Sequence, residues 1–265
     1  KIMITPLGLF GLERGRQARD ELGQVIEMLD IRNRINPNNV IIRTGGSVTK
    51  YNAEKYMIES IKYGWMYAGG HHDYSISSKI GCVAKTHNIC PISKLPGIDQ
   101  PEDMARICIA PTKDVKGKKP FERVATRLEK EYGDAVEFVP ITNKPWKEAV
   151  KIKSTCNVTF DQFWVPTYAN NAIESMFMKH AVLSRIDRWT HMLYPNLPII
   201  NTPTESQLYE GLKQLIENPE EIKERGKLGQ EFVMAHHTPE IVAKQWEQLI
   251  AFVAEGRSTR MEVSQ

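Results

Sequence analysis

The chain has 265 residues, 41% hydrophobic and 25% charged, which is ordinary for a globular protein of one large domain or two modest ones. Its formal net charge of +3 is too mild to indicate nucleic-acid binding, although it suits an anionic substrate or a peripheral contact with acidic lipid. No apolar run approaches the roughly 18 residues that a membrane-spanning helix requires. The cysteines are spread too widely for a metal site, which favours a reduced, cytoplasmic protein: Cys82, Cys90, Cys108 and Cys156.

The first block of the chain, residues 1–98, is expected to form a short α/β lobe. Short apolar runs predict strands, and apolar residues at helical spacing predict helices. The expected strands are 1–6, 40–42, 73–77 and 81–84, and the expected helices are 18–29 and 52–67. Residues 87–100 hold two prolines and a glycine and are typical of a linker.

A second block, residues 99–253, repeats the α/β pattern, and residues 254–265 form a polar tail. Strands are expected at 106–110, 136–139, 158–165, 181–183 and 198–201, and helices at 121–132, 146–152, 205–217, 219–235 and 239–253. Alternating strands and helices imply a parallel sheet with helices on both faces. The two blocks therefore predict an α/β fold of two Rossmann-like lobes, with a ligand cleft between them.

The segment from Cys156 to Ser184 is the leading candidate for a ligand site. It predicts a strand, a polar elbow at 166–171, a helix from Ala172 and a second strand. In such units ligands bind at the carboxyl ends of the strands, and free N–H groups at the helix N-terminus favour phosphate. Glu174 is expected in the first helical turn, where the dipole favours a carboxylate and where it would accept hydrogen bonds from sugar hydroxyls.

The second block contains three runs whose order and spacing match a known family: residues 107–131, 158–184 and 197–253. Together they resemble the carboxyl-terminal domain of family-4-type glycosyltransferases, which have the two-lobed GT-B fold. The run VIIRTGGSVTKYN, residues 40–52, resembles the strand and loop of that family that face the donor sugar and the acceptor. The resemblance implies sugar transfer from a nucleotide-sugar donor with retained anomeric configuration, no cofactor and no bound metal. The first lobe, residues 1–98, is short or incomplete compared with the first lobe of that family.

The resemblance also implies site residues. Lys116 matches the family's donor-phosphate lysine and Glu174 its ribose-binding glutamate, and both are predicted as catalytic. Without a metal, the charge that develops on a leaving nucleoside diphosphate needs a cation or N–H groups nearby, which fits Lys116. The predicted donor-binding residues are Gly117, Tyr168, Asn170, Asn171 and Ala172, and those on the acceptor or sugar side are Gly46 and Ser47.

Each of these residues also has a structural interpretation. Lys116 fits a solvated turn, Glu174 a dipole-favoured helix start, and the asparagines fit helix caps. Adjacent histidines diverge, so the pairs at 71–72 and 236–237 are not expected to bind a metal. Further structural expectations are core positions for Trp164, Met176 and Phe177, a strand cap at Asp73, and a solvated face of Lys118, Lys119 and Arg123.

Two departures from the family's pattern bear on the chemistry. The family's first glutamate falls at or near Pro166, and Gly45 stands where many members carry a histidine. Two other functions stay open. The missing groups favour a non-catalytic nucleotide-sugar-binding protein, and they count against a nucleotide-sugar epimerase of GT-B fold, which needs acid and base groups in the cleft. The donor base and sugar stay open too, as do the oligomeric state and the acceptor, which could be a glycan, a lipid, a small molecule, a protein or a modified nucleic acid.

Overall fold

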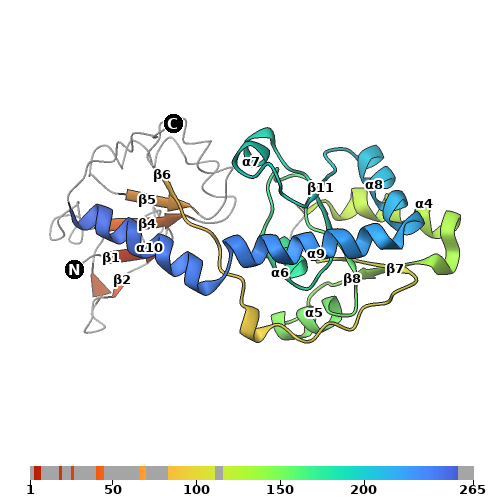
Figure 1. Cartoon of the computed structure of the whole chain (residues 1–265), viewed down its shortest axis with the longest axis horizontal. Coiled ribbons are helices and arrows are strands. Elements are labelled where there is room, and N and C mark those ends of the chain that lie inside the picture. The colour runs from red at the N-terminus through yellow and green to blue at the C-terminus, as the bar shows by residue number, and fades with distance from the viewer. Residues whose placement is uncertain are drawn as a thin grey trace. The chain divides into compact units, whose positions relative to one another are not determined.

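The computed structural model describes residues 3–6, 18–19, 25–26, 40–44, 66–69, 83–110 and 116–255 (Figure 1). The chain divides into two compact units, one of Lys1–His87 with Val242–Gln265 and one of Asn88–Ile241. The sequence-based division falls at residues 98 and 99, whereas here the first unit ends at His87 and also takes in most of the last helix, from Val242.

The first unit contains a parallel sheet in the order β1-β4-β5-β6. Its strands are β1 (Met3–Pro6), β4 (Val40–Thr44), β5 (Met66–Gly69) and β6 (Val83–Lys85). The expected strands at 1–6, 40–42 and 81–84 are thereby confirmed. Helix α10 (Pro239–Ala254) packs Leu249 and Val253 with Ile41 and Ala68 of this sheet, which explains why it belongs to the first unit.

Some expectations for the first unit are wrong. Within the expected helix 18–29, the structure has two short antiparallel strands, β2 (Ala18–Arg19) and β3 (Val25–Ile26). The β-branched pair in β3 favours a strand, which helical spacing alone does not reveal. The end of the expected helix 52–67 is likewise strand β5. The expected strand 73–77 lies outside the described residues.

The second unit is built on a parallel sheet in the order β11-β10-β9-β7-β8. Its strands are β7 (Ala105–Ile109), β8 (Val136–Pro140), β9 (Val158–Phe160), β10 (Ala181–Ser184) and β11 (Ile200–Asn201). All five were expected. Strand β9 is shorter than the expected 158–165, since the chain leaves the sheet after Phe160.

The helices of the second unit also follow the sequence pattern, with one addition. They are α4 (Lys118–Tyr132), α5 (Trp146–Lys153), α6 (Asn170–Phe177), α7 (Arg188–Leu193), α8 (Glu205–Glu217) and α9 (Pro219–His236). Helix α7 was not predicted from the sequence, and Asp187 caps it by accepting from the Thr190 N–H. The linker before β7 contains one short 3-10 turn, Ile92–Lys94. Gly133 ends α4 at a positive φ of 53°.

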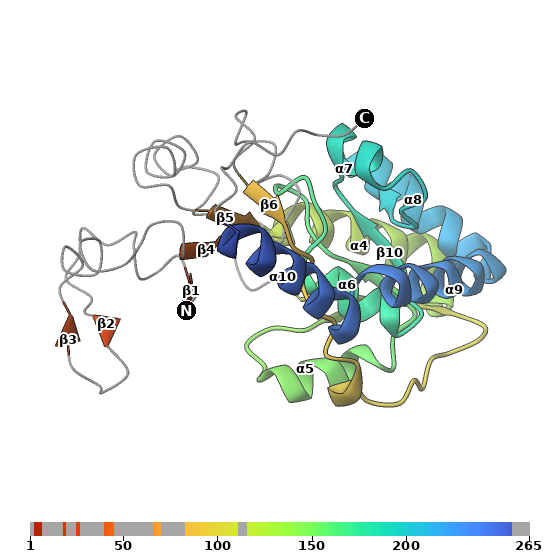
Figure 2. The ribbon, with the colours of Figure 1, turned by 60° about the vertical axis from the view of Figure 1, so that its left-hand side comes forward.

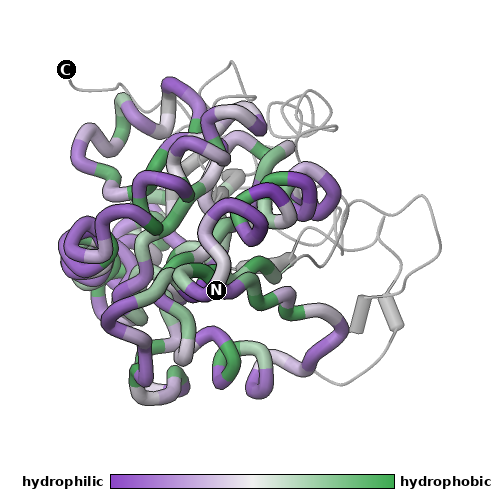
Figure 3. The backbone as a smooth tube through the Cα atoms, turned by 90° about the vertical axis from the view of Figure 1, so that its right-hand side faces the viewer, coloured by the Kyte–Doolittle hydropathy of each residue, from purple (hydrophilic) through white to green (hydrophobic). Residues whose placement is uncertain are grey.

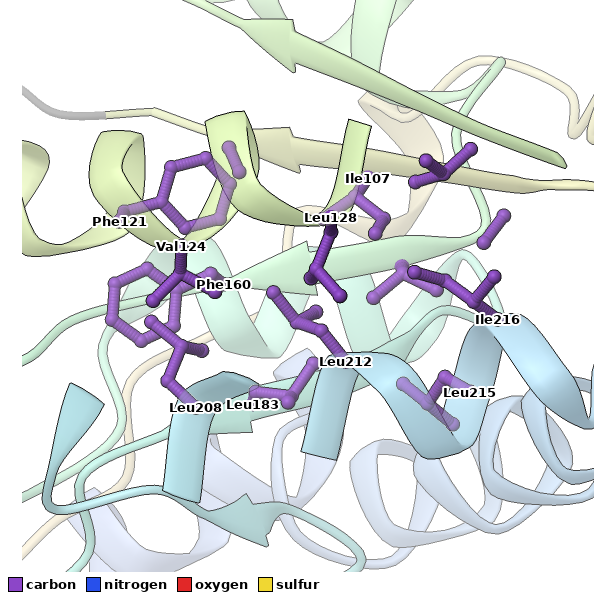
Figure 4. Packing of buried hydrophobic residues seen from close by; sticks show 14 of the residues in the cluster. Ile107, Phe121, Val124, Leu128, Phe160, Leu183, Leu208, Leu212, Leu215 and Ile216 are labelled. Atoms are coloured by element: carbon purple, nitrogen blue, oxygen red, sulfur yellow. The ribbon is translucent and has the colours of Figure 1, made fainter. Parts of the chain in front are cut away.

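Alternating side chains divide the sheet of the second unit into two faces. Ile107 and Ile109 pack in a cluster with residues of α4 and α8 (Figure 4), whereas Cys108, between them, packs against α5 residues. Phe121 of α4 stacks on Phe160 of β9 with ring centroids 5.4 Å apart. Helices α6 and α9 cover the same side of β10, through Val182 (Figure 2). Helices on both faces of a parallel sheet are the expected doubly wound arrangement.

Hydrophilic and hydrophobic residues alternate along the helices of the second unit, as Figure 3 shows. Met176 is 1% exposed and Phe177 packs against the same cluster, so both core expectations are confirmed. The expectation for Trp164 is wrong, because this side chain is 51% exposed. It follows the end of β9 on a turn and rests edge-on against Phe163.

Candidate functional site

Lys116 directly precedes Gly117, the N-cap of α4, and its side chain is 14% exposed. Its ammonium donates a hydrogen bond to Gln162 Oε1 at 2.9 Å and lies 3.3 Å from Asp161 Oδ1. Both partners directly follow β9. Parallel strands end at the same edge of a sheet, which is why residues 45 positions apart meet here. Lys116 is therefore not a fully solvated turn residue.

Gly117 caps α4 with a φ of +80°, a backbone conformation that residues with a side chain rarely adopt. A β-carbon at this position would lie 2.3 Å from Phe163 Cβ. Glycine thus lets the start of α4 approach the loop after β9. This close approach holds Lys116 next to its two partners.

Asp161 connects these groups and was missed by sequence reasoning. It is 1% exposed. Its Oδ1 accepts from Lys116 Nζ and from Asn171 Nδ2, and its Oδ2 accepts from the Ala169 N–H at 2.9 Å. A carboxylate at the N-terminus of a helix interacts favourably with the helix dipole. Asp161 therefore ties the lysine of one loop to the start of α6.

The neighbouring Gln162 fixes the loop between β9 and α6. The Gln162 side chain is buried, and its amide donates to the backbone carbonyl of Thr167. The backbone carbonyl of Gln162 accepts from the Arg185 N–H at 3.0 Å. A loop tied at several points has few conformations to lose when a ligand binds. Residues 167–172, which include four of the predicted donor-binding residues, are consequently anchored in place.

Helix α6 begins at Asn170 rather than at the expected Ala172, and its N-cap residue is Ala169. The first backbone bond of the helix runs from the Ile173 N–H to the Ala169 carbonyl. The asparagines stand inside the first turn, so the capping interpretation is wrong. The N–H groups of Asn170, Asn171 and Ala172 precede this first helical bond and point out of the helix N-terminus.

Two of the predicted donor-binding side chains have roles of their own in the structure. Asn170 is exposed and accepts from Asn88 Nδ2 at 2.8 Å. Tyr168 is 4% exposed and packs in the apolar cluster of α6, α7 and α9, where burial raises its pKa well above the usual value. Its hydroxyl lies 3.2 Å from His237 Nε2. Tyr168 is thus a core residue that secures the start of α6.

Glu174 lies in the second turn of α6, not in the first as expected, because the helix starts earlier. Its carboxylate has two donors from α5. Trp146 Nε1 donates to Oε1 at 3.0 Å, and Lys153 Nζ donates to Oε2 at 2.8 Å. The Glu174 side chain is 11% exposed. Neither α5 residue was singled out by the sequence, and only the tertiary contact reveals them.

Other candidates lie elsewhere. Gly45, Gly46, Ser47, Asp73 and the histidines at 71 and 72 lie outside the described residues. His237 is buried, with Nδ1 2.8 Å from the Asn88 carbonyl. Within the described part of the chain, no group of three histidine, cysteine or acidic residues could hold a metal ion, and no helix is long and apolar enough to cross a membrane.

No protein-family profile matches the chain, and neither does the sequence of any curated protein. Solved structures do match. Sucrose-phosphate synthase from Thermosynechococcus elongatus has a TM-score of 0.63 at 16% identity, over 86% of this chain and 71% of that one. HepE of Anabaena, in complex with UDP and glucose, has a TM-score of 0.60 at 7% identity, over 81% of this chain and 71% of that one.

TarM has a TM-score of 0.61 at 13% identity, over 82% of this chain. The chain spans 55% of the length of TarM. The TM-scores establish the fold, but sequence identities this low do not establish the chemistry. The protein has the α/β fold of the GT-B glycosyltransferases.

Proposed function

We propose that this protein transfers a sugar from a nucleotide-sugar donor to an acceptor, as family-4-type enzymes do, with retention of the anomeric configuration. The observation that carries the proposal is the polar cluster at the carboxyl ends of β7 and β9. There, Lys116 and the N-terminus of α6 are joined through Asp161. The fold supports the same proposal, since HepE shares it and binds UDP and glucose.

Lys116 would stabilise the diphosphate of the donor. An ammonium has three N–H donors. Among the described residues, Gln162 and Asp161 accept two of those of Lys116, which leaves the third for a phosphate oxygen. When the bond between the sugar and the diphosphate breaks, its electron pair passes to the diphosphate oxygen. A cation and helix N–H groups close to that oxygen stabilise the charge that develops there. No metal or cofactor is required in this proposal.

Glu174 would bind the ribose of the donor. Asn170 and Glu174 are four residues apart and share one face of α6, separated by about 6 Å along the helix axis. A ribose and its attached diphosphate are separated by a similar distance. A carboxylate accepts about four hydrogen bonds, so the two donors from α5 leave two acceptor positions for ribose hydroxyls.

The acceptor side rests on Gly46 and Ser47 by resemblance only. A second candidate function, a non-catalytic nucleotide-sugar-binding protein, is favoured by two observations. The family's first glutamate, whose position falls at or near Pro166, is missing, and Asp161 already neutralises Lys116. This candidate predicts donor binding without transfer or hydrolysis. A nucleotide-sugar epimerase would instead produce an isomeric donor without any acceptor.

The test is incubation of the purified chain with UDP-, GDP-, ADP- and TDP-sugars, alone and with acceptor candidates, followed by measurement of released nucleoside diphosphate and of sugar products. Transfer in wild type that is lost in Lys116→Ala and Glu174→Ala, but kept in Lys118→Ala, is the expected result, with folding checked by circular dichroism. NMR of the product linkage tests retention. Turnover that is unchanged in both site variants would overturn this site.

A further inference from the structure

Lys153 is a buried charge that the proposed chemistry does not use. It is the last residue of α5 and only 2% exposed. Lysines are almost never fully buried unless paired, and the partner here is Glu174, 2.8 Å away. Removing two charges from water is costly, and an apolar pair of similar volume often stabilises a fold as well or better. Stability alone therefore does not explain why α5 and α6 meet through this ion pair.

The geometry of the pair explains it better. Trp146 and Lys153 stand at opposite ends of α5, and each donates to a different oxygen of Glu174. The terminal torsion of a glutamate side chain is otherwise broad, so its oxygens have no fixed direction. Donors on both oxygens fix the plane of the carboxylate. They also leave one acceptor position on each oxygen, which matches the two neighbouring hydroxyls of a ribose.

We propose that Lys153 and Trp146 are positioning residues that aim the Glu174 carboxylate at the ribose of the nucleotide. This inference rests on the proposed function, in which Glu174 binds that ribose. Trp146 is 39% exposed, whereas Lys153 is buried and paired with Glu174. Loss of either donor frees the carboxylate to rotate. The expected consequence is a loss of selectivity for the ribose hydroxyls rather than a uniform loss of nucleotide binding.

The experiment compares UDP, GDP and ADP with their 2′,3′-dideoxy forms by isothermal titration calorimetry. Wild type is expected to prefer the ribose form of its best ligand by at least about tenfold, since a carboxylate makes charge-assisted hydrogen bonds. Lys153→Met and Trp146→Phe are expected to reduce that preference at least about fivefold. Lys151→Met, on the exposed side of the same helix, is the matched control and should keep the wild-type preference.

A charge swap separates positioning from folding. Lys153→Glu with Glu174→Lys keeps an ion pair between α5 and α6, so it is expected to fold but to lose the preference for ribose. A preference that persists in the swap, or in both single variants, would overturn the inference. A purely structural role would lower the melting temperature of these variants and leave the preference intact.

Failure of the proposed function gives a different result. If wild type binds neither these three diphosphates nor TDP, the proposed function fails, and this inference fails with it. If wild type binds TDP alone, whose deoxyribose lacks the 2′-hydroxyl, the proposed function stands and this inference fails. If wild type binds ribose and dideoxy forms equally, diphosphate binding stands, while the positioning of Glu174 for a ribose is refuted.

Discussion

Replacement of Lys116 by methionine tests the polar cluster most sharply, because two separable effects are expected. The first is a loss of stability. The Asp161 side chain is fully buried, and without Lys116 its donors among the described residues are the Ala169 N–H and the Asn171 amide. Breaking a buried ion pair lowers the free energy of unfolding by about 3–5 kcal/mol. Because Lys116 is partly exposed, we expect a loss of about 3 kcal/mol.

The second effect is on binding. A hydrogen bond from an ammonium to a phosphate oxygen contributes about 1.5–3 kcal/mol, or roughly 10- to 150-fold in affinity. Lys116→Met also gives the cluster a net charge of −1, which repels a diphosphate further. The double variant Lys116→Met with Asp161→Asn restores the net charge of the wild-type cluster, since a neutral pair replaces one positive and one negative group.

The double variant should therefore recover most of the free energy of unfolding, measured by urea denaturation, while its affinity for UDP stays about 10-fold or more below wild type in calorimetry. Lys118→Met is the control, because this neighbouring lysine is exposed and its ion-pair partner in the described part of the chain is Glu122 on its own helix. Wild-type UDP affinity in the double variant would refute a phosphate contact by Lys116. An unstable double variant would refute the pairing of Lys116 with Asp161.

Three further predictions follow from the second unit. Gly117→Ala should lower the free energy of unfolding by about 1–3 kcal/mol, given the left-handed φ and a contact of 2.3 Å, whereas Gly97→Ala, with open space around it, should not. Burial raises the pKa of Cys90 to about 12, so its thiol should stay unalkylated by iodoacetamide in the native protein at pH 8 and react after unfolding, as read by mass spectrometry. Lys153→Met should lower the free energy of unfolding, measured by urea denaturation, by about 3–5 kcal/mol, and adding Glu174→Leu should recover most of this loss. An equal loss in the single and the double variant would contradict a buried pair.

The secondary structure of the second unit was largely predictable because strong local patterns specify it. Helix α8 has the expected bounds, since its apolar residues repeat at helical spacing between the Thr204 cap and Asn218. The aromatic residues after Phe160 led to a predicted strand that is too long, because an apolar residue on an exposed turn looks the same in sequence as one in a strand. For this reason Asp161 was not recognised as a site residue, and Trp164 was wrongly predicted to lie in the core.

Long-range contacts could not be predicted from the sequence. The ion pair between Lys153 and Glu174 joins residues 21 positions apart, and nothing local distinguishes this lysine from exposed ones on α5. Helix α10 follows α9 directly in sequence, yet it packs on Ile41 and Ala68 of the first unit. In both cases the partner is selected by the three-dimensional arrangement rather than by spacing.

The most direct test of the account is a crystal structure of the protein with UDP bound. We expect diphosphate oxygens within hydrogen-bonding distance of Lys116 Nζ and of the N–H groups at the start of α6, and ribose hydroxyls on the Glu174 carboxylate. A UDP molecule that is bound away from β7 and β9, or a Glu174 whose oxygens contact only Trp146 and Lys153 in that complex, would contradict the account.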